Sequence, residues 1–200
     1  MSSYVVGLTG GIACGKTNLS NALRRYGVHV IDADEISRSV TAEDGAALPA
    51  IRAAFGDAVF DGETLDRRAL ARIVFDDAEK RHILNGIIHP LVFEQMQNEI
   101  ASHDGPVVLD VPLLYEVGID RWCDEVWCAY VPQKEQVRRL RKRNGITVRE
   151  ALSRIHAQMP VREKCRRADH VIRTDGSKEN SASIVLSLWN AIETKGEIHS

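Results

Sequence analysis

Short apolar runs alternate with amphipathic stretches along the 200-residue chain. The apolar runs, bounded by glycine, proline or polar residues, predict five strands: Tyr4–Leu8, Val28–Ile31, Val107–Val111, Val126–Val131 and His170–Ile172. Apolar residues at helical spacing predict helices over 16–26, 133–143 and 178–193, the first of which ends at Gly27. Strands that alternate with helices and are apolar on both faces are typical of an α/β protein with a parallel sheet.

The stretch between the second and third predicted strands departs from this alternation. It contains several helical patterns and no convincing strand: Asp66 can cap a helix through Phe75, and Pro90 can open another. Roughly seventy residues are far more than a crossover between two strands requires. We therefore expect a helical lobe, residues 35–103, inserted into a single domain that spans residues 1–200.

A second helical insertion precedes the last predicted strand. Thr147 and Glu150 stand at the spacing of a capping box, and Pro160 can start a further helix. Residues 134–167 carry twelve Lys or Arg against three Glu, an excess of nine positive charges. Such a run is either a solvated, salt-bridged face or a surface that attracts and binds an anionic substrate. We expect residues 144–168 to form a helical lid over such a substrate.

The composition limits the class of protein. The chain is 44% hydrophobic and 27% charged, with a net charge of −2, which is ordinary for a globular protein and gives no reason to expect a nucleic-acid partner. It contains no bilayer-length apolar run and no signal peptide. Its four cysteines show neither a CxxC pair nor zinc-ligand spacing, so we expect reduced thiols in a cytoplasmic protein without membrane association.

The segment GGIACGKT, which starts at Gly10, satisfies the phosphate-loop pattern G-x-x-x-x-G-K-[ST] between a predicted strand and a predicted helix. Glycines allow main-chain amides to turn toward phosphate oxygens, and the helix start adds its own amides and dipole. Lys16 would reach the β- and γ-phosphates of ATP, and the Thr17 hydroxyl would ligate Mg²⁺. We expect ATP to be bound by Gly10, Gly11, Ile12, Ala13, Cys14, Gly15, Lys16, Thr17 and Asn18.

Carboxylates follow two of the predicted strands. Asp32 and Asp34 would lie on the same side of an extended segment, where either could accept the proton of an attacking hydroxyl or cap the next helix. Asp110 ends the third strand, and it could hold Mg²⁺ through water or cap a turn. The chain lacks the N-K-x-D segment that reads guanine, which counts against a GTPase. The phosphate loop itself occurs in kinases, ATPases and regulatory switches alike.

The order of the motifs resembles the dephospho-CoA kinase family, which catalyses the last step of coenzyme A synthesis. The matching segments cover about residues 4 to 176. Besides the phosphate loop with the preceding Gly7-Leu8-Thr9, they are Val30-Ile31-Asp32-Ala33-Asp34, Leu65-Asp66-Arg67-Arg68-x-Leu70, His89-Pro90, Pro112-Leu113-Leu114-Tyr115-Glu116, and Gln158-Met159-Pro160 followed by Lys164 and Ala168-Asp169-His170-Val171-Ile172. The resemblance implies a five-stranded parallel P-loop kinase core with helices on both faces, a helical CoA lobe and a lid. It also implies transfer of the γ-phosphate of ATP, with Mg²⁺, to the 3′-hydroxyl of the dephospho-CoA ribose, which gives CoA and ADP.

The resemblance also implies roles for individual residues. Asp34 would be the base, and Thr9 would orient the reacting groups beside Lys16. Arg143 and Arg154 would neutralise the transferring phosphate. The residues that would contact the acceptor are Asp34, Arg67, His89, Leu113, Leu114, Glu116 and Arg154. His89 also fits a structural histidine that precedes a proline. No obligate protein partner is implied.

The chain departs from the family pattern at Ala13-Cys14, where Gly-Ser is usual, and at Tyr115, where Phe is usual. Cys14 stands at a helix start beside Lys16, an environment that lowers the pKa of a thiol. Oxidation or alkylation of Cys14 would then block ATP binding, whereas a shielded Cys14 would be inert. Two other functions stay open: a kinase for a nucleoside monophosphate, shikimate or gluconate, and an ATP-binding regulatory module without turnover.

Overall fold

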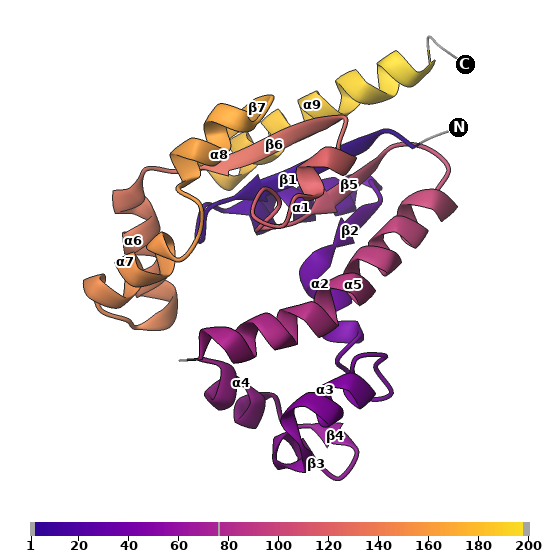
Figure 1. Cartoon of the computed structure of the whole chain (residues 1–200). Helices are drawn as coiled ribbons and strands as arrows, with labels where there is room; N and C mark the ends of the chain where they lie inside the picture. The colour runs from indigo at the N-terminus through magenta and orange to yellow at the C-terminus, as the bar shows by residue number, and fades with distance from the viewer. Residues whose placement is uncertain (1–2, 76, 198–200) are drawn as a thin grey trace. The chain divides into compact units, whose positions relative to one another are not determined.

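The computed structural model describes residues 3–75 and 77–197 (Figure 1). The chain divides into two compact units. The first comprises the described residues up to Ile31 together with those from His103 onward, and the second is Asp32–Ser102. All but the last residue of the predicted inserted lobe, 35–103, belong to the second unit.

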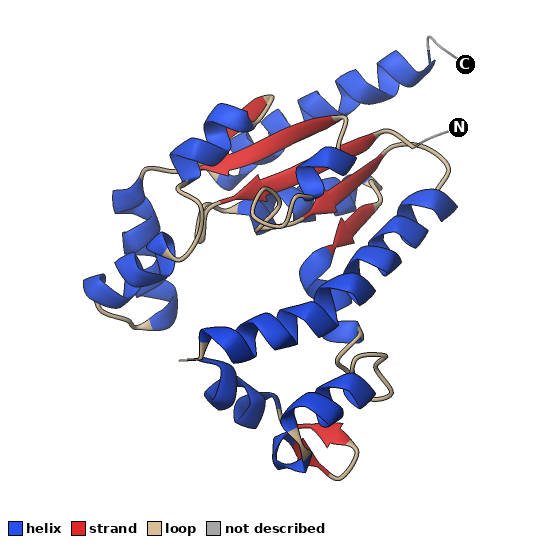
Figure 2. Ribbon diagram, in the orientation of Figure 1, coloured by secondary structure: helices blue, strands red, loops and turns tan. Residues whose placement is uncertain are grey.

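A five-stranded parallel sheet carries helices on both faces, as the sequence predicted (Figure 2). Its strand order is β2-β5-β1-β6-β7. The strands are β1 (Val5–Gly10), β2 (Val30–Asp32), β5 (Val107–Asp110), β6 (Glu125–Tyr130) and β7 (His170–Arg173), each within two residues of its predicted limits. The central strand β1 pairs with β5 from Val5↔Val107 and with β6 from Val6↔Glu125. It is buried along its whole length, which explains why its apolar run does not alternate with polar residues.

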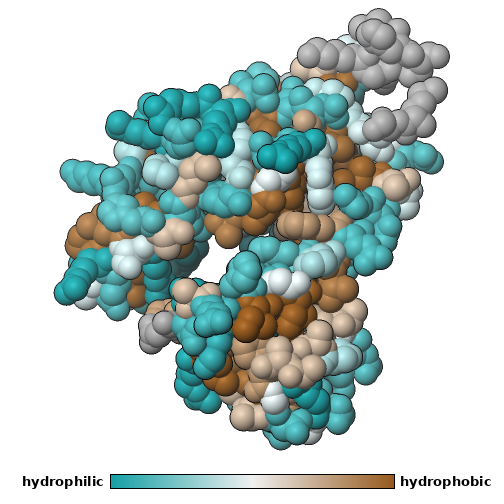
Figure 3. Space-filling model, in the orientation of Figure 1, coloured by the Kyte–Doolittle hydropathy of each residue, from teal (hydrophilic) through white to brown (hydrophobic). Residues whose placement is uncertain are grey.

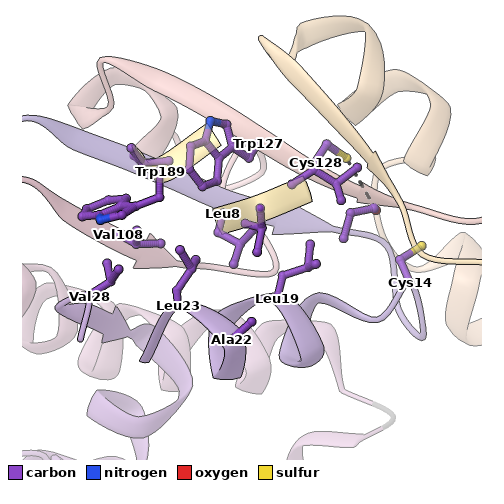
Figure 4. Packing of buried hydrophobic residues seen from close by; sticks show 14 of the residues in the cluster. Leu8, Cys14, Leu19, Ala22, Leu23, Val28, Val108, Trp127, Cys128 and Trp189 are labelled. Carbon is purple, nitrogen blue, oxygen red and sulfur yellow. Dashed lines mark hydrogen bonds between the residues drawn. The ribbon is translucent and has the colours of Figure 1, made fainter. Parts of the chain in front are cut away.

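Helices α1 (Lys16–Tyr26) and α9 (Lys178–Glu197) pack against each other and against strands of the sheet, while α8 (Val161–Arg167) contacts β6 and β1. The main core lies between the sheet and helices α1 and α9, where Leu23 of α1, Trp189 of α9 and Trp127 of β6 belong to one buried cluster (Figure 4). Cys128 follows Trp127, so its side chain points to the opposite face, where it meets α8. The central sheet is therefore covered on both faces.

Two further helices, α6 (Gln133–Asn144) and α7 (Val148–His156), pack against each other through Leu140 and Ile155. The predicted capping box is confirmed: the Thr147 hydroxyl accepts from the Glu150 amide, and the Glu150 carboxylate accepts from the Thr147 amide. Pro160 is the N-cap of α8, so this helix begins at Val161, one residue after the predicted start. The predicted lid, 144–168, thus consists of α7, α8 and their connection.

The second unit contains α2 (Ala33–Ser39), α3 (Leu48–Phe55), β3 (Phe60–Asp61), β4 (Thr64–Leu65), α4 (Arg67–Phe75) and α5 (Ala78–Ser102). The Asp66 carboxylate accepts from the amides of Arg68 and Ala69 at 2.9 and 3.0 Å, which confirms it as the cap of α4. The expectation of a lobe without strands is wrong, because β3 and β4 form a hairpin around Gly62. Strands of two residues are too short to show an alternating pattern in the sequence.

Pro90 does not open a helix as predicted but lies inside α5. A proline within a helix removes one backbone hydrogen bond and costs about 3 kcal/mol. Because α5 packs against α2, α3 and α4, burial of residues such as Val92 and Met96 outweighs this cost. Among the helices of the described residues, α5 included, none combines the length and apolarity that crossing a bilayer requires.

Candidate active site

The predicted phosphate loop joins the carboxyl end of β1 to the start of α1. Gly15 precedes the helix with a φ of 81°, in the left-handed region that glycine adopts without strain. Gly10 is required for space, because a Cβ there would stand 2.8 Å from the Ala129 carbonyl oxygen of β6. Ala13 also has a positive φ of 62°, at a position where the family usually has glycine. The loop therefore has the strand–turn–helix geometry that its pattern predicted.

Side chains from distant parts of the first unit hold the loop backbone. The Gln136 amide nitrogen of α6 donates to the Ile12 carbonyl at 2.8 Å. The Ile12 amide donates to the Gln158 side-chain oxygen at 3.1 Å. A phosphate oxygen can therefore use the Ile12 amide only when Gln158 moves away, which couples the region before α8 to the state of the loop.

The next two residues of the loop are held from α6 and from the segment after β7. The Arg139 guanidinium donates to the Ala13 carbonyl at 3.3 Å and to the Thr174 carbonyl at 2.5 Å. The Thr174 hydroxyl donates to the Cys14 carbonyl at 2.5 Å. Sequence reasoning assigned no role to Gln136, Arg139 or Thr174. No sequence pattern predicts these contacts, because most of the partners are main-chain atoms far away along the chain.

Lys16 forms an ion pair with Asp110 at the end of β5. The Asp110 side chain is only 2% exposed and that of Lys16 is 15% exposed. Thr17 lies exposed in the first turn of α1. A hydroxyl and a carboxylate are hard oxygen donors that suit Mg²⁺, which usually takes few protein ligands and completes its shell with phosphate and water. These two residues fit the metal site that the sequence predicted.

Asn18, the last residue predicted to bind ATP, is turned toward α9. Its side-chain amide donates to the Lys178 carbonyl at 3.1 Å and to the Ser181 hydroxyl at 3.2 Å. These bonds fasten the first turn of α1 to the first turn of α9. The Asn18 side chain therefore helps to hold the phosphate loop in place.

The Pro112 carbonyl, just after β5, accepts two hydrogen bonds. The buried Thr9 hydroxyl donates to it at 3.1 Å, and the Lys164 ammonium of α8 donates to it at 2.6 Å. Lys164 is 0% exposed and also pairs with the Glu116 carboxylate at 2.8 Å. Glu116 accepts in addition from the Met159 amide at 3.0 Å. Lys164 therefore ties α8 to the turn after β5, a role that a lysine within a basic run does not reveal in the sequence.

The three residues between Pro112 and Glu116 have different surroundings. Leu113 is 39% exposed, whereas Leu114 is fully buried beside Gly7 of β1. The Tyr115 hydroxyl is buried and has no hydrogen-bond partner among the described residues. Burial raises the pKa of Tyr115 above its ordinary value, and the guanidinium of Arg167 lies 5.7 Å from the ring centre. The turn thus offers one exposed apolar side chain and one unsatisfied buried hydroxyl.

The two predicted carboxylates after β2 do not lie along one extended strand, and that expectation is wrong. The strand ends at Asp32, whose carboxylate caps α2 by accepting from the amides of Asp34 and Glu35 at 2.9 and 3.2 Å. Asp34 stands in the first turn of this helix, within the second unit. Among the described residues, none forms a hydrogen bond or ion pair with the Asp34 carboxylate. Of the two, Asp34 is therefore the carboxylate available as a base.

Two other predicted residues of the second unit make contacts within it. The Arg67 guanidinium donates to the carbonyls of Arg38 and Thr41 at 3.1 and 3.0 Å, at the end of α2. His89 is half-buried in α5, with its ring centre 5.7 Å from that of Phe93. Burial lowers the pKa of His89, which favours a neutral imidazole near neutral pH.

The basic run 134–167 is in part a salt-bridged face. Glu135 and Glu163 each pair with two arginines one helical turn away. Arg143 and Arg154, predicted to contact phosphate, are exposed on α6 and α7. Figure 3 shows hydrophilic side chains gathered over α8. The interpretation as a salt-bridged face is thus confirmed for part of the run, and the interpretation as a surface that binds an anionic substrate stays a prediction.

The expectation that the pKa of Cys14 is lowered is wrong. The Cys14 side chain is 1% exposed and belongs to the hydrophobic cluster of α1 and the sheet (Figure 4). Burial raises the pKa of this thiol to about 11, because the desolvation of a thiolate outweighs the field of the helix start. The structure therefore favours a shielded, inert Cys14.

Comparisons with known proteins identify similar chains. The family model described as dephospho-CoA kinase matches residues 4–180. The dephospho-CoA kinase of Geobacillus kaustophilus is 44% identical over 96% of this chain and 99% of its own. That of Carboxydothermus hydrogenoformans is 41% identical over 92% of each chain. Such identity extends across the phosphate loop, the second unit and the basic helices.

Two solved structures share the fold. The crystal structure of TT1252 from Thermus thermophilus has a TM-score of 0.82 at 34% identity, and it covers 96% of this chain and 98% of its own. The dephospho-CoA kinase from Campylobacter jejuni has a TM-score of 0.66 at 21% identity, with the same coverage of 96% and 98%. The architecture is thus one that solved proteins adopt along nearly their whole length.

Proposed function

Since the chain belongs to the dephospho-CoA kinase family, we propose that it transfers the γ-phosphate of ATP to the 3′-hydroxyl of the ribose of dephospho-CoA, giving CoA and ADP. One observation carries the proposal: a complete phosphate loop ends in Lys16, which is paired with the buried Asp110, in a chain that the family matches over residues 4–180. Because the protein of a phosphoryl-transfer enzyme mainly positions groups and neutralises charge, this loop is the part that the reaction requires.

At the ATP end, residues 10–18 would bind the phosphates through their main-chain amides. Lys16 would exchange its ion pair with Asp110 for the β- and γ-phosphate oxygens, and the Asp110 carboxylate would contribute to the metal site. Thr17 and Asp110 would hold Mg²⁺, which neutralises charge on the phosphates when it is bound. The Ile12 amide would join once Gln158 releases it.

At the acceptor end, Asp34 would align the ribose hydroxyl and accept its proton. Its carboxylate is not engaged by another described residue, as a base requires. Thr9 would help orient the reacting groups through the Pro112 carbonyl that it binds. Arg143 and Arg154 would neutralise the transferring phosphate, and their exposure leaves both guanidinium groups available.

The remaining assignments concern the acceptor. Leu113 would contact the adenosine end of dephospho-CoA with its exposed side chain, and Leu114 and Glu116, from the same turn, would help to form that contact surface. Arg67 and His89 would contact the substrate from the lobe 35–103, the proposed CoA lobe. The segment 144–168 would act as the lid that excludes water from the reaction.

The test is the conversion of dephospho-CoA to CoA by the purified chain with magnesium and ATP, followed by chromatography. Lys16→Ala should reduce turnover by about 10³-fold or more, because a phosphate clamp of this kind stabilises the transition state. Asp34→Asn should lower kcat far more than it changes ATP affinity. Asp61→Asn, in the exposed β3–β4 hairpin, is the matched control and should leave kcat and ATP affinity unchanged.

The alternatives predict different results in the same assay. Faster transfer to a nucleoside monophosphate, shikimate or gluconate would identify a different small-molecule kinase. ATP binding without transfer to any acceptor would indicate a regulatory module. The cytoplasmic location, and the absence of a nucleic-acid or obligate protein partner, stay predictions from the sequence.

A further inference from the structure

Two thiols lie in contact on the face of the sheet that α8 covers. The sulfur atoms of Cys128 in β6 and Cys165 in α8 are 3.7 Å apart and share a hydrogen bond. Cys128 is fully buried, whereas Cys165 is half-buried. Cys128 belongs to the same hydrophobic cluster as Cys14 of the phosphate loop, and Cys165 packs against it, but neither has a part in the proposed reaction, so the pair needs an explanation of its own.

The two thiols differ in reactivity because their surroundings differ. The Cys165 thiol donates to the Cys128 sulfur, and the hydrogen bond between the two groups lowers the pKa of Cys165. The same bond, and then burial, raise the pKa of Cys128 above its ordinary value. The thiolate is the form that attacks disulfides. Cys165 is thus both the more accessible sulfur and the one that ionises first.

The surface around Cys165 is positively charged. Arg162, Arg166 and Arg167 lie exposed on α8, within three residues of Cys165 on either side. Two of them, Arg166 and Arg167, share the carboxylate of Glu163, so the helix keeps a net positive charge. A cationic surface raises the local concentration of small anions. An anionic oxidant would therefore meet Cys165 more often than a neutral one.

We propose that Cys165 and Cys128 form a site of disulfide modification, for which a small anionic disulfide such as oxidised glutathione is the oxidant. The Cys165 thiolate attacks one sulfur of the oxidant, and a glutathione thiolate leaves with the electron pair of the broken bond. The Cys128 thiol then loses its proton, attacks the Cys165 sulfur, and displaces the second glutathione thiolate. Two protein thiols are oxidised, one disulfide is reduced, and the two protons pass to the two glutathione molecules.

The new bond would act on the site through Lys164, the neighbour of Cys165. The sulfurs must approach from 3.7 Å to about 2.0 Å, so α8 must shift against β6. Lys164 would move with the helix, away from its present bonds to the Pro112 carbonyl and the Glu116 carboxylate. A displacement of about 1 Å can reduce catalysis up to ~100-fold. We therefore expect the turnover of the oxidised protein to be lower by about 10-fold or more.

The experiment incubates the full-length reduced chain with oxidised glutathione and follows it by peptide mass spectrometry and by the kinase assay. We expect a peptide pair joined through Cys128 and Cys165, lighter than the two reduced peptides by two hydrogen atoms. Turnover should fall with the same time course and return after dithiothreitol. The loss of turnover rests on the proposed function, whereas the cross-linked peptide does not.

Three variants separate the steps. Cys128→Ala should stop at a mixed disulfide of glutathione on Cys165. Cys165→Ala should form neither the mixed disulfide nor the Cys128–Cys165 disulfide, and it should keep its full turnover in the presence of oxidised glutathione. Cys123→Ala, which removes a half-buried thiol of the same unit, is the matched control and should respond like the unchanged chain.

Several results would overturn the inference. These are an unmodified Cys165, a cross-link that involves Cys14 or Cys123 instead, or a Cys128–Cys165 disulfide in a protein whose turnover is unchanged. If the chain does not phosphorylate dephospho-CoA at all, the proposed function fails, and the peptide map still decides whether the disulfide forms.

Discussion

Tyr115→Phe tests whether the buried hydroxyl of the turn after β5 destabilises the protein. The family usually has Phe at this position, and the structure gives the Tyr115 hydroxyl no hydrogen-bond partner among the described residues. A polar group that loses water without gaining a partner costs about 1–3 kcal/mol of stability. Removing the oxygen leaves a small void, which at about 24 cal/mol per Å³ costs a few tenths of a kcal/mol. The variant should therefore be more stable by roughly 1–2 kcal/mol.

Urea unfolding followed by circular dichroism measures this difference. The midpoint should rise with an unchanged slope, and the melting temperature should increase by about 2–4 °C for each kcal/mol in a chain of this size. Tyr4→Phe is the matched control, because that hydroxyl is exposed and donates to Glu125 at 3.3 Å. The control should change stability by less than about 0.5 kcal/mol. A Tyr115→Phe variant less stable than the unchanged chain would refute the reasoning and show that the hydroxyl has a partner.

Three more predictions concern backbone strain, pH and a buried ion pair. Ala13→Gly relieves a positive φ that costs an L-residue about 1–2 kcal/mol. Because glycine also has a larger conformational entropy in the unfolded chain, the free energy of unfolding should rise by no more than about 1 kcal/mol. A lower urea midpoint would contradict this. Hydrogen bonds, mainly from Arg138 and also from Arg139, lower the pKa of Glu135 from 4.5 to about 2. The pairing of Glu135 with these arginines therefore stabilises the fold fully above pH 4.5, and this stabilisation is lost as the pH falls toward 2. The difference in unfolding free energy between the unchanged chain and Glu135→Gln should shrink over that range, and a constant difference would count against the pairing. Lys16→Met removes the ammonium that pairs with the buried Asp110 carboxylate and should lower the urea midpoint, and Asp110→Asn in the same chain should recover part of that loss. Equal midpoints for the single and double variants would show that the charge of Asp110 is balanced elsewhere.

Local features of the sequence predicted most of the fold. The five strands, the helix that starts at Lys16, the cap at Asp66 and the box of Thr147 with Glu150 depend on residues close together in the chain. Their physical causes are apolar periodicity and hydrogen bonds between a side chain and the nearest backbone amides. The phosphate loop belongs to the same class, because one short segment supplies its turn, its lysine and its helix start.

The predictions that were wrong depended on burial or on packing between distant segments. Pro90 lies inside a helix because neighbouring helices hold α5, and Cys14 has a raised pKa because its thiol is in the core. Asp32 caps a helix rather than extending the strand, so its carboxylate and that of Asp34 are not equivalent. A pattern of residue types shows none of this, because it does not tell which side chain loses contact with water.

The sequence alone determined where the phosphate loop is and that it suits the phosphates of a nucleotide, because amides, a lysine and a hydroxyl in one segment need no distant partner to be recognised. Only the tertiary structure decided what holds that loop: Ile12 is bound by side chains 124 and 146 residues further along the chain. It also decided that Lys164 is buried and tied to Glu116. Such contacts arise when helices pack on a sheet, and packing brings together residues whose separation along the chain carries no signal.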